Sequence, residues 1–244
     1  MNIAGAGSLP GGVYDDLISI SGSGKITGSA SCKAFHCSGA GAVDGDLVCQ
    51  EEYRCSGAGK VHGSLQAKTM HVSGSCKCDG TVTVIETLQA SGAFHAGTTS
   101  AGEFHGSGTT TIDGDLSAET IRISGTIHCK GLLNGDSVDI RFGGNSQADN
   151  IGGSNIRIAP GESRVNGISG FFRRMFGAEE RTLTFDVAGS VEGDEIYLEH
   201  VSAASVSGRV VTIGPGCNIG KLFYIESAEV SPDASVGYTE QLPG

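Results

Sequence analysis

Cysteine and histidine side chains, which are common zinc ligands, are spread along this chain of 244 residues. The chain has eight cysteines and seven histidines. Seven of the cysteines occupy positions that alternate with other residue types, at 32, 37, 49, 55, 76, 78 and 129. This alternation predicts a file of buried thiols along strands, whereas zinc needs four ligands in a tetrahedral array. We therefore expect packing residues, and neither a metal nor any other cofactor.

The histidines share their positions in the sequence pattern with lysines and arginines. Six of them stand at positions that we expect to face outward: His36, His62, His71, His95, His105 and His128. Arg54 and Arg122 fall on the same strip as His36 and His71. A solvated face is the simplest interpretation. The alternative is a pH-sensitive strip that binds an acidic partner, because imidazoles titrate near neutral pH.

Pairs of aspartates in two DGD words resemble catalytic carboxylates in composition. The pairs are Asp44 with Asp46 and Asp113 with Asp115. They recur at the same point of a repeat, and neither pair has a general acid in view. We expect them to be solvated turns. The glycine-rich runs GAGKVHG at 57 and GCNIGKL at 216 lack the order and spacing of nucleotide-binding loops.

A nine-residue sequence motif repeats along the first half of the chain. It reads SGSGKITGS at 21, SGAGAVDGD at 38, SGAGKVHGS at 56 and SGSCKCDGT at 73, with further copies at 91, 107 and 124. Successive copies are 16 to 18 residues apart. A short fixed period is typical of a solenoid in which each repeat forms one turn.

Apolar residues alternate with polar ones on both sides of each SG step, which is the pattern of short strands with one buried face. Three such inward pairs occur per repeat, six residues apart. We therefore predict an all-β protein, a three-sided parallel β-helix with turns of about 17 residues. Its corners would be the SG step and a glycine seven residues after the Ser, such as Gly28 or Gly45, where positive φ suits a bend.

The repeat also defines the expected organisation of the chain. Residues 1–16 would be a tail or partial cap, 17–158 β-helix turns, 159–181 an insert or hinge, 182–237 further turns, and 238–244 a tail. Whether the two blocks form one stack or two lobes stays open. The insert holds an amphipathic cluster that could cap an end, bind a partner or touch a membrane: Phe171, Phe172, Arg173, Arg174 and Phe176.

The charge and the apolar pattern limit the partners. A formal net charge of −11 argues against sequence-independent binding of nucleic acid and against bulk attraction to anionic lipid. No apolar run is long enough to span a membrane, and the first residues, MNIAGAGSLPGG, lack the features of a signal peptide. We expect a cytoplasmic protein.

The repeated SGxGxVxGD word, together with VEGDEIYLEHV at 191 and VTIGPGCNIG at 211, resembles the bactofilins, and looks like their longer two-block members found in Firmicutes. The resemblance covers nearly the whole chain. It implies a right-handed triangular β-helix whose subunits join end to end into filaments without nucleotide. The implied partners are further copies of the chain, a paralogous bactofilin, and client proteins of the cell envelope, morphology or motility. Peripheral attachment at the inner face of the cell membrane is compatible with this class.

Open strand edges at the two ends of such a solenoid would template another chain. We expect the contacts at Leu17, Ile18 and Ile20 at one end, and at Val230 and Val236 at the other. Two alternatives to a non-enzymatic structural protein have different sequence signatures. A hexapeptide-type acyltransferase would have a left-handed β-helix and a catalytic His on a protruding loop, which the SG repeats lack. A secreted β-helix acting on carbohydrate would show an export signal and a charged groove, and neither is evident.

Overall fold

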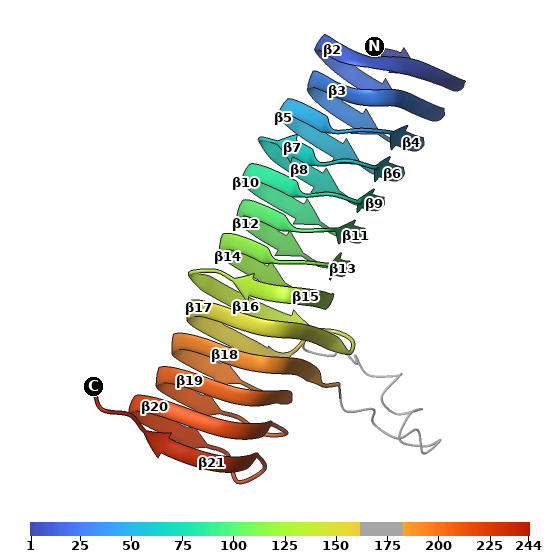
Figure 1. Ribbon diagram of the computed structural model, residues 1–244. Helices are drawn as coiled ribbons and strands as arrows, with labels where there is room; N and C mark the ends of the chain where they lie inside the picture. Colours follow the sequence, from blue (N-terminus) through green and yellow to red (C-terminus); the bar gives the residue numbers. More distant parts are fainter. Residues whose placement is uncertain (162–182) are drawn as a thin grey trace, which may run out of the picture.

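The computed structural model describes residues 1–161 and 183–244. In these residues the chain is all-β, and parallel strands wind into a single solenoid of about 13 turns (Figure 1). The strands are β1 (Asn2–Ile3), β2 (Ala6–Ile20), β3 (Ser23–Cys37), β4 (Ala40–Val43), β5 (Leu47–Cys55), β6 (Ala58–Val61), β7 (Leu65–Ala67), β8 (Thr69–Val72), β9 (Ser75–Cys78), β10 (Val82–Ala90), β11 (Ala93–Ala96), β12 (Thr99–Gly106), β13 (Thr109–Ile112), β14 (Leu116–Ile123), β15 (Thr126–Asn134), β16 (Ser137–Phe142), β17 (Ser146–Pro160), β18 (Phe185–Leu198), β19 (Val201–Ile213), β20 (Asn218–Val230) and β21 (Ser235–Gln241). The predicted all-β solenoid with a spacing of about 17 residues is confirmed.

Each turn consists of three short segments that align with the same segments of the neighbouring turns. Within β3, Ser23–Ile26 aligns with β4, Ala30–Cys32 with the first part of β5, and Ala34–Cys37 with its last part. Ile20 lies in register with Cys37, one period later. The three inward pairs of each repeat therefore correspond to three strand segments.

The inward side chains form one core that runs along the solenoid from Ile3 to Leu222. Large and small residues complement each other across it. Phe35 stacks on Tyr53 of the next turn, with ring centroids 5.4 Å apart. The Tyr53 hydroxyl reaches so close to Gly59 that a Cβ there would lie 2.5 Å from it. Small residues on one side of the core thus leave room for aromatic rings from another side.

Close approach of the stacked turns, and not positive φ, explains most of the corner glycines. A Cβ on Gly39, Gly57 or Gly74, at three SG steps, would overlap the carbonyl oxygen of the glycine one turn earlier. Among the described glycines seven residues after the Ser, Gly28 has a positive φ of 107°, but the others, such as Gly45, do not. The expectation of positive φ at the corners is therefore wrong except at Gly28. The other corners need glycine because no side chain fits between the turns.

The two blocks of turns form one continuous stack. β17 aligns with β18 from Ser146, opposite Phe185, to Ile158, opposite Leu198. β18 aligns with β19 in the same way, and β19 with β20. The stack therefore continues across the break in the repeat, and Figure 1 shows the strands on both sides of the break in the same column.

The structure places the limits of the stack differently from the sequence-based boundaries. Residues 1–16, expected as a tail or partial cap, supply β1 and most of β2, which pair in parallel with the following turns. Here Ala4 and Gly5 replace the SG step, 17 residues before Ser21 and Gly22. β17 runs to Pro160, two residues past the expected limit, and β18 starts at Phe185. At the other end β21 reaches Gln241, inside the expected tail of 238–244.

The insert cluster of Phe171, Phe172, Arg173, Arg174 and Phe176 lies outside the described residues. In the described part of the chain, no helix is long and apolar enough to cross a membrane.

Candidate functional site

The N-terminal end of the solenoid is a strand edge formed by β1 and β2 (Figure 1). Among the described residues, β1 pairs only with β2, and residues 6–14 of β2 pair only with β3. Ile3, Leu9 and Tyr14 align with the buried Ile20, Ile26 and Cys32 of the next turn, so they face inward. Leu9 and Tyr14 remain partly exposed, and Met1 is 61% exposed. We call Met1, Ile3, Leu9 and Tyr14 the N-terminal end surface.

The C-terminal end has the same construction. Within residues 1–161 and 183–244, β21 pairs only with β20, and Ser227–Val230 pairs only with β19. Val236 aligns with Ile219 and Thr239 with Leu222, two buried residues, so both face inward. Val230, in register with the buried Ile213, is itself 43% exposed because no strand of the described residues covers it. We call Ala228, Val230, Val236 and Thr239 the C-terminal end surface.

The structure separates the residues that the sequence assigned to the ends. Val230 and Val236 lie at the C-terminal end, as expected. Ile18 and Ile20 do not lie at the N-terminal end, because both are fully buried under the first turn. Leu17, in the same strand, is 37% exposed. Ile18 and Ile20 are buried because one more turn, formed by β1 and the start of β2, precedes them.

Sequence reasoning missed Met1, Ile3, Leu9 and Tyr14 as end residues. The signal for them was present in the repeat, because Ile3 precedes Ala4 and Gly5 as Ile20 precedes Ser21 and Gly22. The replacement of Ser by Ala and the glycines of GAGSLPGG concealed this first turn.

Acidic residues flank both end surfaces. Asp15 and Asp16 lie in β2, beside the N-terminal end surface. Glu229 and Glu240 lie in the last turn, beside the C-terminal end surface. Two such ends repel each other at low salt, and salt screens this repulsion.

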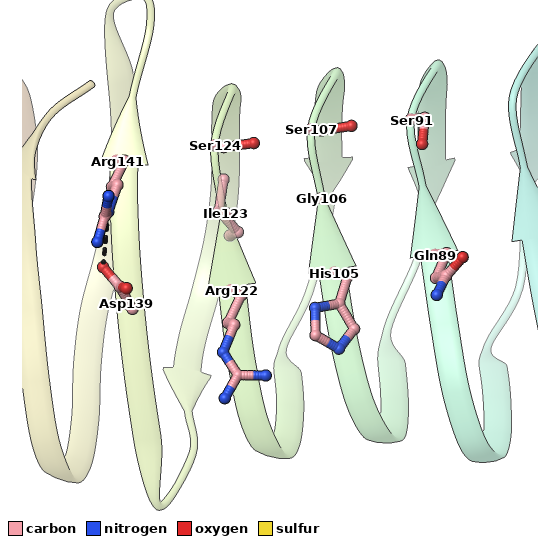
Figure 2. A pocket seen from close by; sticks show the side chains of 10 residues that line it. All are labelled: Gln89, Ser91, His105, Gly106, Ser107, Arg122, Ile123, Ser124, Asp139 and Arg141. Carbon is pink, nitrogen blue, oxygen red and sulfur yellow. Dashed lines mark ion pairs between the residues drawn. The ribbon is translucent and has the colours of Figure 1, made fainter. Parts of the chain in front are cut away.

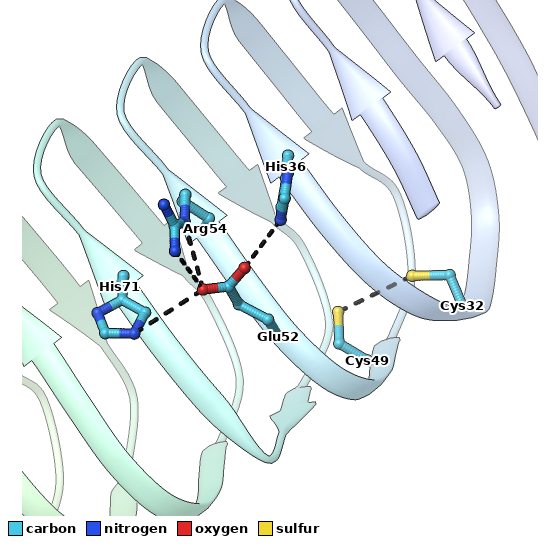
Figure 3. Close-up of polar contacts among 6 residues, drawn as sticks. All are labelled: Cys32, His36, Cys49, Glu52, Arg54 and His71. Atoms are coloured by element: carbon cyan, nitrogen blue, oxygen red, sulfur yellow. Dashed lines mark hydrogen bonds and ion pairs between the residues drawn. The ribbon is translucent and has the colours of Figure 1, made fainter. Parts of the chain in front are cut away.

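One side of the solenoid carries an outward strip in which each turn contributes one residue. His36, Arg54 and His71 are consecutive members of this strip. Their side chains converge on the carboxylate of Glu52 (Figure 3): Arg54 donates to it at 2.6 Å, His36 lies at 2.9 Å and His71 at 3.8 Å. Against the effect of partial burial, the contacts with Arg54 and His36 hold the pKa of Glu52 below its usual value. His36 and His71 therefore face outward, as expected, and lie beside a carboxylate.

A second outward strip, to which Lys25 and His95 belong, also carries ion pairs between neighbouring turns. Lys25 pairs with Asp44 at 3.0 Å, and both His95 and Lys130 pair with Asp113 at 2.7 Å. The hydrogen bond from His95, with that from Lys130, lowers the pKa of Asp113 to about 2. These pairs join side chains of neighbouring turns, and each such exposed pair contributes little to stability.

The seven cysteines that the repeat assigned to inward positions are buried, as predicted, and so is Cys217, for which no prediction was made. All eight are buried and none forms a disulfide, although the sulfur atoms of Cys32 and Cys49 are 3.9 Å apart (Figure 3). Burial raises the pKa of Cys76 to about 12, so this thiol is protonated at neutral pH. In residues 1–161 and 183–244, no group of three or more His, Cys, Asp or Glu side chains is arranged to hold a metal ion.

The DGD words have a structural role at the corners. Asp46 accepts a hydrogen bond of 2.8 Å from the backbone N–H of Ser64, one turn later. Asp115 accepts an equivalent bond from Leu132. The first aspartates, Asp44 and Asp113, form the ion pairs described above. The second aspartate of each DGD motif thus accepts a hydrogen bond from a backbone N–H of the next turn.

Fold and ends together define a parallel β-solenoid with an unpaired strand edge at each end of its described residues. No family model matches the chain, and no solved structure matches it. A Bacillus subtilis (strain 168) protein, named uncharacterized protein YhbF, is 34% identical over 107 residues. These residues make up 43% of this chain and 40% of YhbF, so the chain spans less than half the length of this relative.

Proposed function

We propose that the chain is a non-enzymatic structural protein that assembles end to end into filaments without nucleotide. The observation that carries this proposal is the pair of end surfaces, where unpaired strand edges lie over a partly exposed core. Solenoids that stay monomeric cover such ends with polar capping elements. In the described residues no helix covers either end.

The two end surfaces fit each other in shape because both are cross-sections of the same repeating turn. Stacking one copy on another would continue the ladder of backbone hydrogen bonds and bury Val230 and Leu9. The side faces favour no such contact, since many of their charged side chains form ion pairs within the copy and the chain has a net charge of −11. Growth along the axis is therefore favoured over lateral association.

The resemblance to bactofilins supports the same proposal and extends it. Filaments of this kind would act as a cytoplasmic scaffold for envelope, morphology or motility proteins, with peripheral contact to the inner face of the membrane. The acyltransferase alternative is not favoured. It requires a catalytic His on a protruding loop, whereas His36, His71, His95 and His105 lie on strands. His62 and His200 lie between strands of the stack, and His62 hydrogen-bonds with Asp79 at 3.0 Å.

Sedimentation and negative-stain electron microscopy of the purified chain, over a range of salt concentrations and with or without nucleotide, test this function. We expect unbranched filaments without nucleotide, and more of them at higher salt, because salt screens the acidic ends. A monomer at every salt concentration, or assembly that requires nucleotide, would contradict the proposal.

A further inference from the structure

A hollow of about 360 Å³ opens on the first outward strip, several turns beyond Glu52 (Figure 2). Its floor is a row of side chains from four consecutive turns, which lie side by side: Gln89, His105, Arg122 and Asp139. Serines of the SG steps, among them Ser107 and Ser124, form a second row beside the first. The volume is in the range of small-ligand sites.

The same strip shows elsewhere how it binds an oxyanion. At Glu52, one arginine and two histidines from three consecutive turns surround a single carboxylate. The spacing of the turns places the guanidinium and the two imidazole rings within 4 Å of the two carboxylate oxygen atoms. A guanidinium with neighbouring imidazoles on this strip is therefore suited to a carboxylate or a phosphate.

Arg122 has the same position on the strip as Arg54 but lacks its carboxylate. Glu52 stands two residues before Arg54, whereas Thr120 stands two residues before Arg122. The carboxylate one turn earlier, Glu103, is bound by His105 at 3.0 Å. No hydrogen bond or ion pair joins the Arg122 guanidinium to any residue in 1–161 or 183–244. Its donors are open to a ligand in the hollow.

Asp139, at the end of the row, supplies a carboxylate that accepts hydrogen bonds, whereas Arg122 donates them. Its Oδ1 atom is buried and has no hydrogen-bond donor among the described residues. Arg141 Nε is 3.7 Å away, which is an ion-pair distance and too long for a hydrogen bond. The side chain is nevertheless 34% exposed, so its other oxygen, Oδ2, is the one that can accept a hydrogen bond from a hydroxyl group of a ligand.

We propose that this hollow binds a small hydroxylated oxyanion, such as a sugar phosphate or a sugar acid. Arg122 binds the anionic group, and Asp139 accepts a hydrogen bond from a hydroxyl of the same ligand. A small ligand fits better than a long polyanion, because the net charge of −11 repels the latter. The site is independent of end-to-end assembly and adds a ligand to a chain proposed as a scaffold.

Isothermal titration calorimetry of the full chain tests the site with glucose 6-phosphate, glucuronate, inorganic phosphate and glucose. We expect at least one of the two anionic sugars to bind more tightly than phosphate or glucose. Arg122→Gln should weaken this binding by about tenfold or more, because a bidentate charge-assisted contact is lost. Arg54→Gln, on the same strip, is the matched control and should leave the affinity unchanged. Asp139→Asn should weaken binding of the sugar but not of inorganic phosphate.

Several results would overturn the proposal. Phosphate binding as tightly as both anionic sugars would mean an adventitious ion only. No heat from either anionic sugar up to about 10 mM would exclude a specific site. Equal affinities for Arg122→Gln and the wild type would remove Arg122 from it. Thermal unfolding of each variant checks the fold, and Arg122→Lys, which keeps the charge but not the planar fork, should bind more weakly than wild type.

Discussion

Gly57 shows how little space separates neighbouring turns at their corners. A Cβ added there would overlap the carbonyl oxygen of Gly39 and lie 2.5 Å from that of Ser38. Because these are backbone atoms of the turn below, Gly57→Ala should lower the free energy of unfolding by about 1–3 kcal/mol. Urea unfolding followed by circular dichroism measures this loss.

Gly143→Ala is the control for this substitution, since nothing lies within 4 Å of a Cβ at Gly143. It should change the free energy of unfolding by less than about 1 kcal/mol. Equal losses in the two variants would contradict the stacking distance as the reason for glycine at this corner.

The sequence predicted the burial of cysteines but not the contacts of outward residues. Cys37 and Cys55 stand at positions that alternation alone assigns to the core, and both are buried. The convergence of His36, Arg54 and His71 on Glu52 depends on which rotamers the side chains adopt, and no periodicity encodes this. For the same reason the open guanidinium of Arg122 became visible only in the structure.

At the scale of the elements, Asp113 connects three turns through His95 in β11 and Lys130 in β15. Its folded-state pKa of about 2 is below the unfolded value of about 3.8. The ionised carboxylate therefore stabilises the fold above the unfolded pKa, and this stabilisation is lost as the pH falls through the folded pKa. Asp113→Asn should be less stable than wild type near neutral pH, and the difference should vanish as the pH falls to about 2. Because the group is exposed, we expect a small effect.

Thermal unfolding midpoints of wild type and Asp113→Asn at several pH values measure this difference. Asp186→Asn is a suitable control, because no ion pair of Asp186 is present in the described ranges. A constant difference between Asp113→Asn and wild type over the whole pH range would contradict the assignment.

The strand segments were predictable where the repeat kept its SG step. They were not predictable where another residue replaces the serine of that step. From Ser21 to Ser124 the words mark each corner, and the structure has strands on both sides of them. At Ala4 the serine is replaced, so β1 and the start of β2 were taken for a tail. The alternation of Ile3 with its neighbours is too short to reveal a strand without its partner in the next turn.

At the scale of the whole molecule, the break in the repeat left two arrangements open. Sequence alone could not decide between one stack and two lobes, because the period is lost between the blocks. The register of β17 with β18 decides for one stack. A single rod has two end surfaces, whereas two separate lobes would have four, so this register limits where copies can join.

The central claim is that copies join through the end surfaces, and one substitution at two places tests it most directly. Val230→Lys places a charge on the C-terminal end surface, and Val48→Lys places the same charge on a side face of β5. The two valines have similar exposure, 43% and 36%, and neither substitution should unfold the chain. Sedimentation and electron microscopy should find filaments for wild type and Val48→Lys, but few or none for Val230→Lys, because an unpaired charge would be buried at every junction. Normal filaments from Val230→Lys together with loss of assembly in Val48→Lys would contradict the account and place the contacts on the side faces.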